Sequence, residues 1–125
     1  MATSVRYIVD DTASAIEFYA KLGFEVVMNP APGFAMLARD DLRLLLNTPG
    51  GGGGAGQGAA DGTPPAPGGW NRFQLIVDDL ESEVTRLRGE GVTFRSDIIQ
   101  GIGGNQIVAD DPSGNPIELF QPTAG

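Results

Sequence analysis

The sequence predicts an α+β fold made of two βαβββ modules, each a mixed sheet with one helix packed on one face. The first reason is a repeat, because Ile8-Val9-Asp10-Asp11 returns 68 residues later as Ile76-Val77-Asp78-Asp79, and a helical pattern follows each copy. The second reason is the segment from Pro49 to Gly69, whose ten glycines and four prolines separate two halves of similar length. We therefore expect one domain, with module 1 at 1–48, a connection at 49–69 and module 2 at 70–125.

The first half predicts a strand, a helix and three further strands. Asp11 is placed to cap the helix and Gly23 to close it. The sequence Asn29-Pro30 is expected to end the second strand. Apolar side chains at helical spacing give the helix one buried face, at Ala15, Phe18, Tyr19 and Leu22. Short apolar runs predict the strands at Ser4–Val9, Phe24–Met28, Phe34–Ala38 and Leu42–Asn47.

The second half repeats this order. Asp78, with Glu81 three residues later, resembles a capping box in which aspartate replaces serine or threonine. Gly91 is expected to close the helix, whose buried face carries Leu80, Val84 and Leu87. The run Asp111-Pro112-Ser113-Gly114-Asn115 predicts a turn. The strands are expected at Arg72–Val77, Val92–Arg95, Gln106–Ala109 and Pro116–Gln121.

Alternation along the strands separates an apolar face from a more polar one. Each helix must cover the apolar face of its sheet, so the other face is left as a concavity. That second face is either plainly solvated, as in many antiparallel sheets, or the wall of a ligand cavity. Its polar members are Arg6, Arg43, Asn47, Arg72, Gln74 and Glu118.

Composition narrows the possible functions. The chain of 125 residues has no cysteine and no histidine, which excludes disulfides, thiolate metal sites, cysteine nucleophiles and every Ser-His-Asp arrangement. Its net charge of −8 disfavours nucleic acid and anionic membrane surfaces as partners. We expect no membrane span, and a cytoplasmic location, since the N-terminal residues show no apolar signal segment.

The segment from Pro49 to Gly69 has two interpretations. Its glycine content prevents it from contributing to a core, so it is expected to be a mobile connection. It is either a plain linker or a flap over a ligand site, since long loops in compact domains are often lids.

Two motifs point to a family. The first half contains Phe18-Tyr19 followed by Leu22-Gly23-Phe24, and the second contains the run from Asp111 to Glu118, Asp-Pro-Ser-Gly-Asn-Pro-Ile-Glu. Together with the repeated Val-Asp-Asp, they resemble the vicinal oxygen chelate superfamily, the glyoxalase/bleomycin-resistance/dioxygenase group. The resemblance covers nearly all of the chain outside 49–69. It implies paired modules whose curved sheets close round a cavity, and in many small members a homodimer.

The resemblance also implies where metal-using members take their ligands. Those positions fall here at Ser4, Leu45, Arg72 and Glu118, of which only Glu118 is a usual ligand. Arg72 brings a permanent cation that repels a divalent metal, so we expect no metal and no cofactor. We predict that an Arg72–Glu118 ion pair takes the place of the metal, the alternative being that Glu118 points to solvent.

Within the superfamily the chain looks most like bleomycin-resistance-type proteins, which sequester a drug without modifying it. Phe34 and Trp70 match aromatic positions of that group, although it often has tryptophan where Phe34 stands, and the long glycine run is a further departure. Each aromatic offers a flat surface for stacking. The alternatives are an ordinary core role for Phe34 and Met36 and a loop anchor for Trp70. The expected ligand-binding residues are Arg6, Ile8, Phe34, Met36, Arg43, Asn47, Trp70, Arg72, Gln74, Glu118 and Phe120.

Three functions are therefore weighed. The first is a non-catalytic protein that binds an aromatic antibiotic or other natural product and confers resistance. The ligand is either cationic, as the net charge favours, or acidic or quinone-like, as the arginines favour. The second is a metal-independent lyase or isomerase that uses Glu118 or Tyr7 as acid or base. The third is an interaction protein without a small ligand.

Overall fold

The computed structural model describes residues 3–50 and 54–123, so part of the glycine run and both chain ends lie outside the described residues. The chain forms two compact units. One takes in the residues up to Gly68 together with the turn Pro112–Asn115, and the other takes in Gly69–Asp111 and the residues from Pro116. The first unit has the predicted βαβββ order and the second has it with one additional short strand, so the α+β fold class is confirmed.

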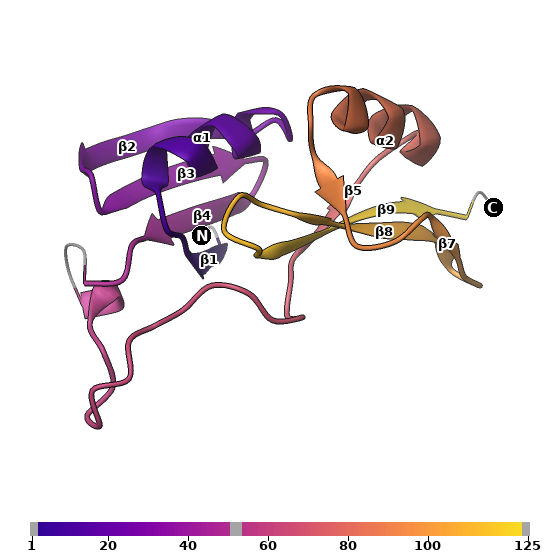
Figure 1. Cartoon of the computed structure of the whole chain (residues 1–125). Helices are drawn as coiled ribbons and strands as arrows, with labels where there is room; N and C mark the ends of the chain where they lie inside the picture. The colour runs from indigo at the N-terminus through magenta and orange to yellow at the C-terminus, as the bar shows by residue number, and fades with distance from the viewer. Residues whose placement is uncertain (1–2, 51–53, 124–125) are drawn as a thin grey trace. The chain divides into compact units, whose positions relative to one another are not determined.

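The first unit is a four-stranded sheet covered on one face by a helix (Figure 1). Its strand order is β1-β4-β3-β2, with β1 parallel to β4 and the other neighbours antiparallel. The helix α1 packs on β2, β3 and β4 through Phe18 and Tyr19, which are buried, as predicted. The elements are β1 Thr3–Ile8, α1 Thr12–Ala20, β2 Glu25–Ala31, β3 Phe34–Arg39 and β4 Leu42–Asn47.

The second unit repeats this plan with shorter outer strands. Its order is β5-β9-β8-β6, with β7 also paired to β8 and with β5 parallel to β9. The helix α2 packs on β9, and Leu80, Val84 and Leu87 are buried as predicted. The elements are β5 Gln74–Ile76, α2 Leu80–Gly89, β6 Thr93–Phe94, β7 Ile99–Gln100, β8 Gly104–Asp110 and β9 Pro116–Pro122.

Both helices end in the same way. Gly23 and Gly91 adopt the left-handed conformation, with φ of 88° and 86°, which side chains with a Cβ disfavour. The next residue then donates its N–H to the carbonyl five residues earlier, Phe24 to Tyr19 and Val92 to Leu87. The two closing glycines predicted from the sequence are thus confirmed.

The predicted cap of α2 is wrong by one residue. Asp79, and not Asp78, is the N-cap, and it accepts hydrogen bonds from the backbone N–H and the hydroxyl of Ser82. Asp11 caps α1 in the same way through Ser14, as predicted. The second aspartate of each Asp-Asp pair is therefore the cap, because it alone lies three residues before the serine that donates.

Three strand predictions also need correction. The strand β2 does not end at Asn29-Pro30 but runs to Ala31, with register shifts on both sides of Met28. A proline is tolerated there because β2 is an edge strand and the register is irregular. The predicted strands at Arg72–Val77 and Val92–Arg95 are shorter, β5 and β6 respectively. The short strand β7 was not predicted.

The described part of the glycine-rich segment contains two local turns that the sequence does not predict. A 3-10 turn covers Gly54–Gly56, and Gly50 donates to the carbonyl of Gly56. A second turn is closed by the backbone bond from Ala59 to Thr63. The lid and linker interpretations both stay predictions. Within the described ranges, no helix has the length and apolar character needed to cross a membrane.

The N-cap of α2 predicts how the stability of the fold depends on pH, and the neighbouring Asp78 provides a matched control. Hydrogen bonds from Ser82 lower the pKa of Asp79 below its ordinary value of 3.8. A lowered folded-state pKa stabilises the fold above the ordinary value, and that stabilisation is lost as the pH falls through the folded pKa. Asp79→Ala is therefore expected to lower the melting temperature at pH 7, and its deficit to shrink below pH 3.8. Asp78→Ala is the matched control, and equal melting temperatures for the two variants at pH 7 would contradict the assignment.

Candidate functional site

The six predicted site residues of the first unit share one face of its sheet, the face opposite α1. Ile8, Asn47 and Phe34 form one row across β1, β4 and β3, because Asn47 is paired with both of the others. Arg6 and Met36 form the next row through Leu45. Arg43 follows one step further along β4. We call this the helix-free face of the first unit, consisting of Arg6, Ile8, Phe34, Met36, Arg43, Leu45 and Asn47.

This face is polar at one end and apolar in the middle. Arg6 and Arg43 are exposed, Phe34 and Met36 are half-buried, and Asn47 is buried. Tyr7, the candidate acid or base, lies between Arg6 and Ile8 on β1 and therefore points to the opposite face of the sheet. It is 8% exposed there, on the face that α1 covers. The structure therefore groups the predicted binding residues of this unit and places Tyr7 away from them.

The second unit brings three predicted site residues into one polar cluster. The Nε and Nη2 atoms of Arg72 lie 3.0 and 2.8 Å from Oε1 of Glu118. Nε2 of Gln74 donates to the other oxygen, Oε2, at 2.6 Å. The side chain of Glu118 is 11% exposed and that of Arg72 is 24% exposed, so the ion pair is largely withdrawn from water. The predicted Arg72–Glu118 pair is confirmed, and the alternative of Glu118 pointing to solvent is wrong.

The metal positions implied by the resemblance do not form a ligand set here. Both oxygens of Glu118 already accept hydrogen bonds, one of them from a guanidinium group that a metal ion would have to displace. Leu45 lies at the matching register position of the first unit, since Arg6 pairs with Leu45 as Gln74 pairs with Glu118. Its side chain has no donor atom. Among the described residues, no group of three potential metal-binding side chains is found.

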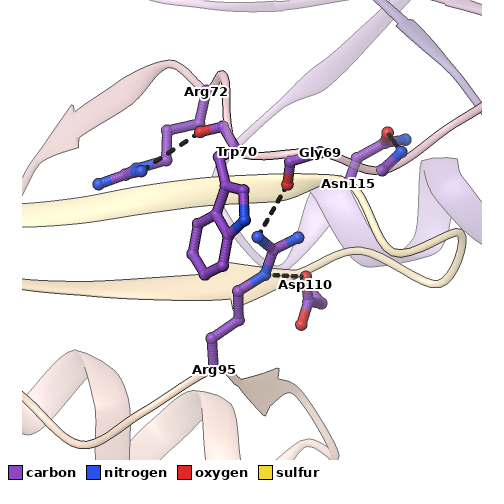
Figure 2. A network of polar contacts seen from close by, with 7 residues as sticks. Gly69, Trp70, Arg72, Arg95, Asp110 and Asn115 are labelled. Carbon is purple, nitrogen blue, oxygen red and sulfur yellow. Dashed lines mark hydrogen bonds and ion pairs between the residues drawn. The ribbon is translucent and has the colours of Figure 1, made fainter.

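Trp70 lies against Arg95 at the start of the second unit (Figure 2). The guanidinium carbon of Arg95 is 4.4 Å from the centre of the indole ring, a cation–π contact. Arg95 also donates from Nε to Asp110 at 2.8 Å and from Nη1 to the carbonyl of Gly69 at 2.8 Å. The carbonyl of Trp70 accepts from Arg72. The backbone is thus held as the anchor interpretation predicts, yet the indole remains 67% exposed and available for stacking.

The predicted turn after β8 holds the first unit together through Asn115. Its side chain donates to the carbonyl of Ile8 at 2.7 Å and accepts from the N–H of Gly68 at 2.8 Å. Ser113 accepts from the N–H of Asp10 at 2.8 Å. Asn115 therefore ties the end of β1 to Gly68, near the end of the glycine-rich segment.

The remaining predicted residue, Phe120, lies on the face of the second sheet opposite α2. It forms one row there with Ile76 and Gln106, next to the row that contains Gln74 and Glu118. The hollow lined by Glu81, Ser82, Thr85 and Arg86 lies on α2 itself and outside that face.

Sequence reasoning missed Arg95, Asp110 and Asn115. Arg95 and Asp110 are 15 residues apart and meet because β6 pairs with β8. The repeat gives no hint of Arg95, whose counterpart 68 residues earlier is Val27. Asn115 was seen only as a turn residue. Its two side-chain bonds reach residues 107 and 47 positions away, which no local pattern can indicate.

The fold and the motifs identify the class of the protein. Residues 3–119 match the model of the Glyoxalase/Bleomycin resistance protein/Dioxygenase superfamily, and the chain belongs to this family. The family resemblance predicted from the sequence is thereby confirmed. Comparison with curated proteins gave no significant match.

Solved structures of the same kind cover nearly the whole chain. A superfamily member from Sphaerobacter thermophilus has 27% identity and a TM-score of 0.77 over 97% of this chain and 96% of its own. An antibiotic-binding protein from a Streptomyces species has 25% identity and a TM-score of 0.72 over 98% and 96%. A lactoylglutathione lyase from Agrobacterium tumefaciens shares the fold, with 20% identity and a TM-score of 0.74 over 97% and 92%. The similar structures thus include both an enzyme and a binding protein.

Proposed function

We propose that the chain is a non-catalytic binding protein that sequesters an aromatic antibiotic or related natural product and so confers resistance. The observation that carries the proposal is the Arg72–Glu118–Gln74 cluster. Glu118 is the one carboxylate at a position where metal-using relatives take a ligand. Both of its oxygens accept hydrogen bonds within this cluster. These oxygens are engaged by neighbouring side chains, so a substrate proton would have to compete with Arg72 and Gln74 for them. The similarity to an antibiotic-binding protein supports the same function.

Binding would be driven by burial of flat apolar surface. The indole of Trp70 is exposed, and Arg95 behind it fixes its orientation, so that stacking on a planar ligand loses little conformational entropy. Burying about 200 Å² of ligand surface at about 25 cal/mol/Å² contributes about 5 kcal/mol before the entropic cost of association. The proposed contact residues are the eleven named from the sequence.

The proposal is tested with a panel of planar aromatic antibiotics. Because Trp70 is the only tryptophan, quenching of its fluorescence reports on ligands at this indole. At least one member of the panel is expected to quench it, to raise the melting temperature and to be recovered chemically unchanged. Trp70→Ala, followed by calorimetry, is expected to weaken binding about tenfold, as loss of one aromatic stack does.

Two results would contradict the proposal. Turnover of a panel member or a related substrate would make the chain an enzyme. If no panel member changed the fluorescence or the melting temperature, sequestration would lose its support. Phe94→Ala is a control variant, because it removes a different aromatic ring, one that lies against Arg88.

We also propose that the chain is a homodimer. Val26, Val27 and Met28 on the edge strand β2 are 46–55% exposed, and Ile76 and Ile99 in the second unit are 52% and 50% exposed. Each unit therefore exposes apolar side chains of its own, and a run of three such residues on an edge strand is typical of protein interfaces. Sedimentation at micromolar concentration is expected to give twice the chain mass of 13.0 kDa. A single species at the chain mass would show that the chain is a monomer.

A further inference from the structure

Two of the seven arginines differ from the rest because no residue that the structure describes is an anionic partner for them. The other five each form an ion pair with a carboxylate within the part of the chain that the structure describes. These are Arg39, Arg72, Arg86, Arg88 and Arg95. Arg6 and Arg43 form no ion pair or hydrogen bond with any described residue. In a chain with twice as many acids as cations, two unpaired arginines are unexpected.

The two unpaired arginines are neighbours on the helix-free face of the first unit. Arg43 is paired with Ser4, and Arg6 follows Ser4 by two residues on β1, so both side chains leave the same face. With strands about 4.8 Å apart and a rise of about 3.3 Å per residue, their Cα atoms lie about 8 Å apart. Both side chains are exposed. A single small anion is therefore within reach of both.

No carboxylate of the same sheet neutralises this pair. In the row of Arg43, the next residues are Ala38 on β3 and Glu25 on β2. Glu25 is thus two strands away from Arg43. Among the described residues, Glu25 forms an ion pair with neither Arg43 nor Arg6.

An apolar strip lies directly beside the two arginines. Arg6 on β1, Leu45 on β4 and Met36 on β3 lie side by side across the sheet. Leu45 and Met36 are half-buried apolar side chains. Phe34 lies in the next row. A flat apolar body on this strip would hold a substituent at its edge within reach of Arg6 and Arg43.

We infer that the ligand is an acidic aromatic compound, with a carboxylate or ionised phenol bound by Arg6 and Arg43 and its ring system on Leu45 and Met36. This inference rests on the proposed function, that the chain binds a planar aromatic ligand, and it specifies the class of ligand for the surface of the first unit by itself. Guanidinium groups bind carboxylates through short, charge-assisted hydrogen bonds and are less strongly hydrated than ammonium groups. Arg72, the third arginine expected at the site, is excluded from this role because Glu118 already neutralises it.

The net charge of −8 does not oppose this assignment at short range. At physiological ionic strength, charges more than about 8 Å apart in solvent are largely screened. The arginines in contact with the ligand therefore determine which ligand charge is preferred. The acidic residues elsewhere on the surface only slow the approach of an anionic ligand. Binding of an acidic ligand is expected to weaken as salt is added, because it depends on two exposed cations.

Three matched probes test the inference by calorimetry on the full chain. They are anthraquinone-2-carboxylate, the neutral anthraquinone-2-carboxamide and the cationic 2-(aminomethyl)anthraquinone. The carboxylate is expected to bind at least about tenfold more tightly than the other two, since a hydrogen bond to a charged group contributes about that factor. Arg6→Gln and Arg43→Gln are each expected to weaken carboxylate binding about tenfold and to leave amide binding within about twofold. Arg6→Lys should retain part of the preference for the carboxylate.

Arg88→Gln is the control, because Arg88 is an exposed arginine on α2 that pairs with Asp97. It should leave all three affinities unchanged. Equal binding of the three probes by the wild-type chain would overturn the inference and leave the proposed function standing. Absence of binding by any of them, and by the antibiotic panel, would remove both. If Arg6→Gln or Arg43→Gln changed the sedimentation coefficient instead, the arginines would belong to a subunit interface and the inference would be wrong.

Discussion

Replacement of Arg72 with methionine is expected to lower the free energy of unfolding by about 2–3 kcal/mol. Removal of one partner from a buried ion pair costs about 3–5 kcal/mol, because the other charge is left without compensation. The side chains here are 24% and 11% exposed, so water screens part of that cost and the expected value is smaller. Urea unfolding at pH 7 measures it.

Two further variants separate the ion pair from simple packing. In Arg72→Met/Glu118→Leu no charge is left unpaired, and much of the lost stability should return. Arg88→Met removes an exposed pair whose atoms are 3.4 Å apart, and it should cost no more than about 0.5 kcal/mol. If Arg72→Met cost as little as Arg88→Met, the cluster would contribute little to stability.

Gly104→Ala is expected to destabilise the second unit by about 2–3 kcal/mol, at the upper end of what overpacking usually costs. A Cβ at this position would lie 2.3 Å from the carbonyl oxygen of Gln121 and 2.7 Å from the ring of Phe120. The contact with the backbone oxygen cannot be relieved by a side-chain rotation. The two strands of the β8–β9 ladder must therefore separate at this end, and the ring of Phe120 must move.

Gly103→Ala is the matched control, since nothing lies within 4 Å of the Cβ it would add. It should unfold at nearly the wild-type urea concentration. Because Phe120 is one of the proposed binding residues, Gly104→Ala should also weaken binding of any planar ligand that contacts this ring. Equal stability of the two alanine variants would contradict the close packing of Gly104 against β9.

The parts of the fold predicted correctly are those with local signals. Gly23 and Gly91 were recognised because a left-handed residue after a helix is almost always glycine, and the helix faces because they follow a 3.6-residue period. Asp78 and Glu81 match the local capping-box pattern, and this match predicts the wrong aspartate as the N-cap of α2. The repeat, which places Asp79 opposite Asp11, was the better guide.

The parts that could not be predicted depend on pairing over long distances. The register of β1 with β4 decides that Arg6 and Arg43 are neighbours, and no local pattern contains it. In the sequence, Arg6, Arg43 and Arg72 are three similar cations on a polar face. Only the structure shows that Arg72 is neutralised by Glu118, whereas Arg6 and Arg43 are not neutralised by any described residue. The sequence alone therefore does not determine the charge of the ligand.

The matching register of Leu45 and Glu118 has a consequence for how such chains change over evolution. The two halves keep the same frame, with the same capping aspartates and closing glycines, yet they carry opposite chemistry at this shared point. A substitution at this register position therefore changes the side chains on the sheet surface opposite the helix of one half, and it leaves the capping aspartate and closing glycine of that half in place. The other half keeps its own residue at the same point of the frame.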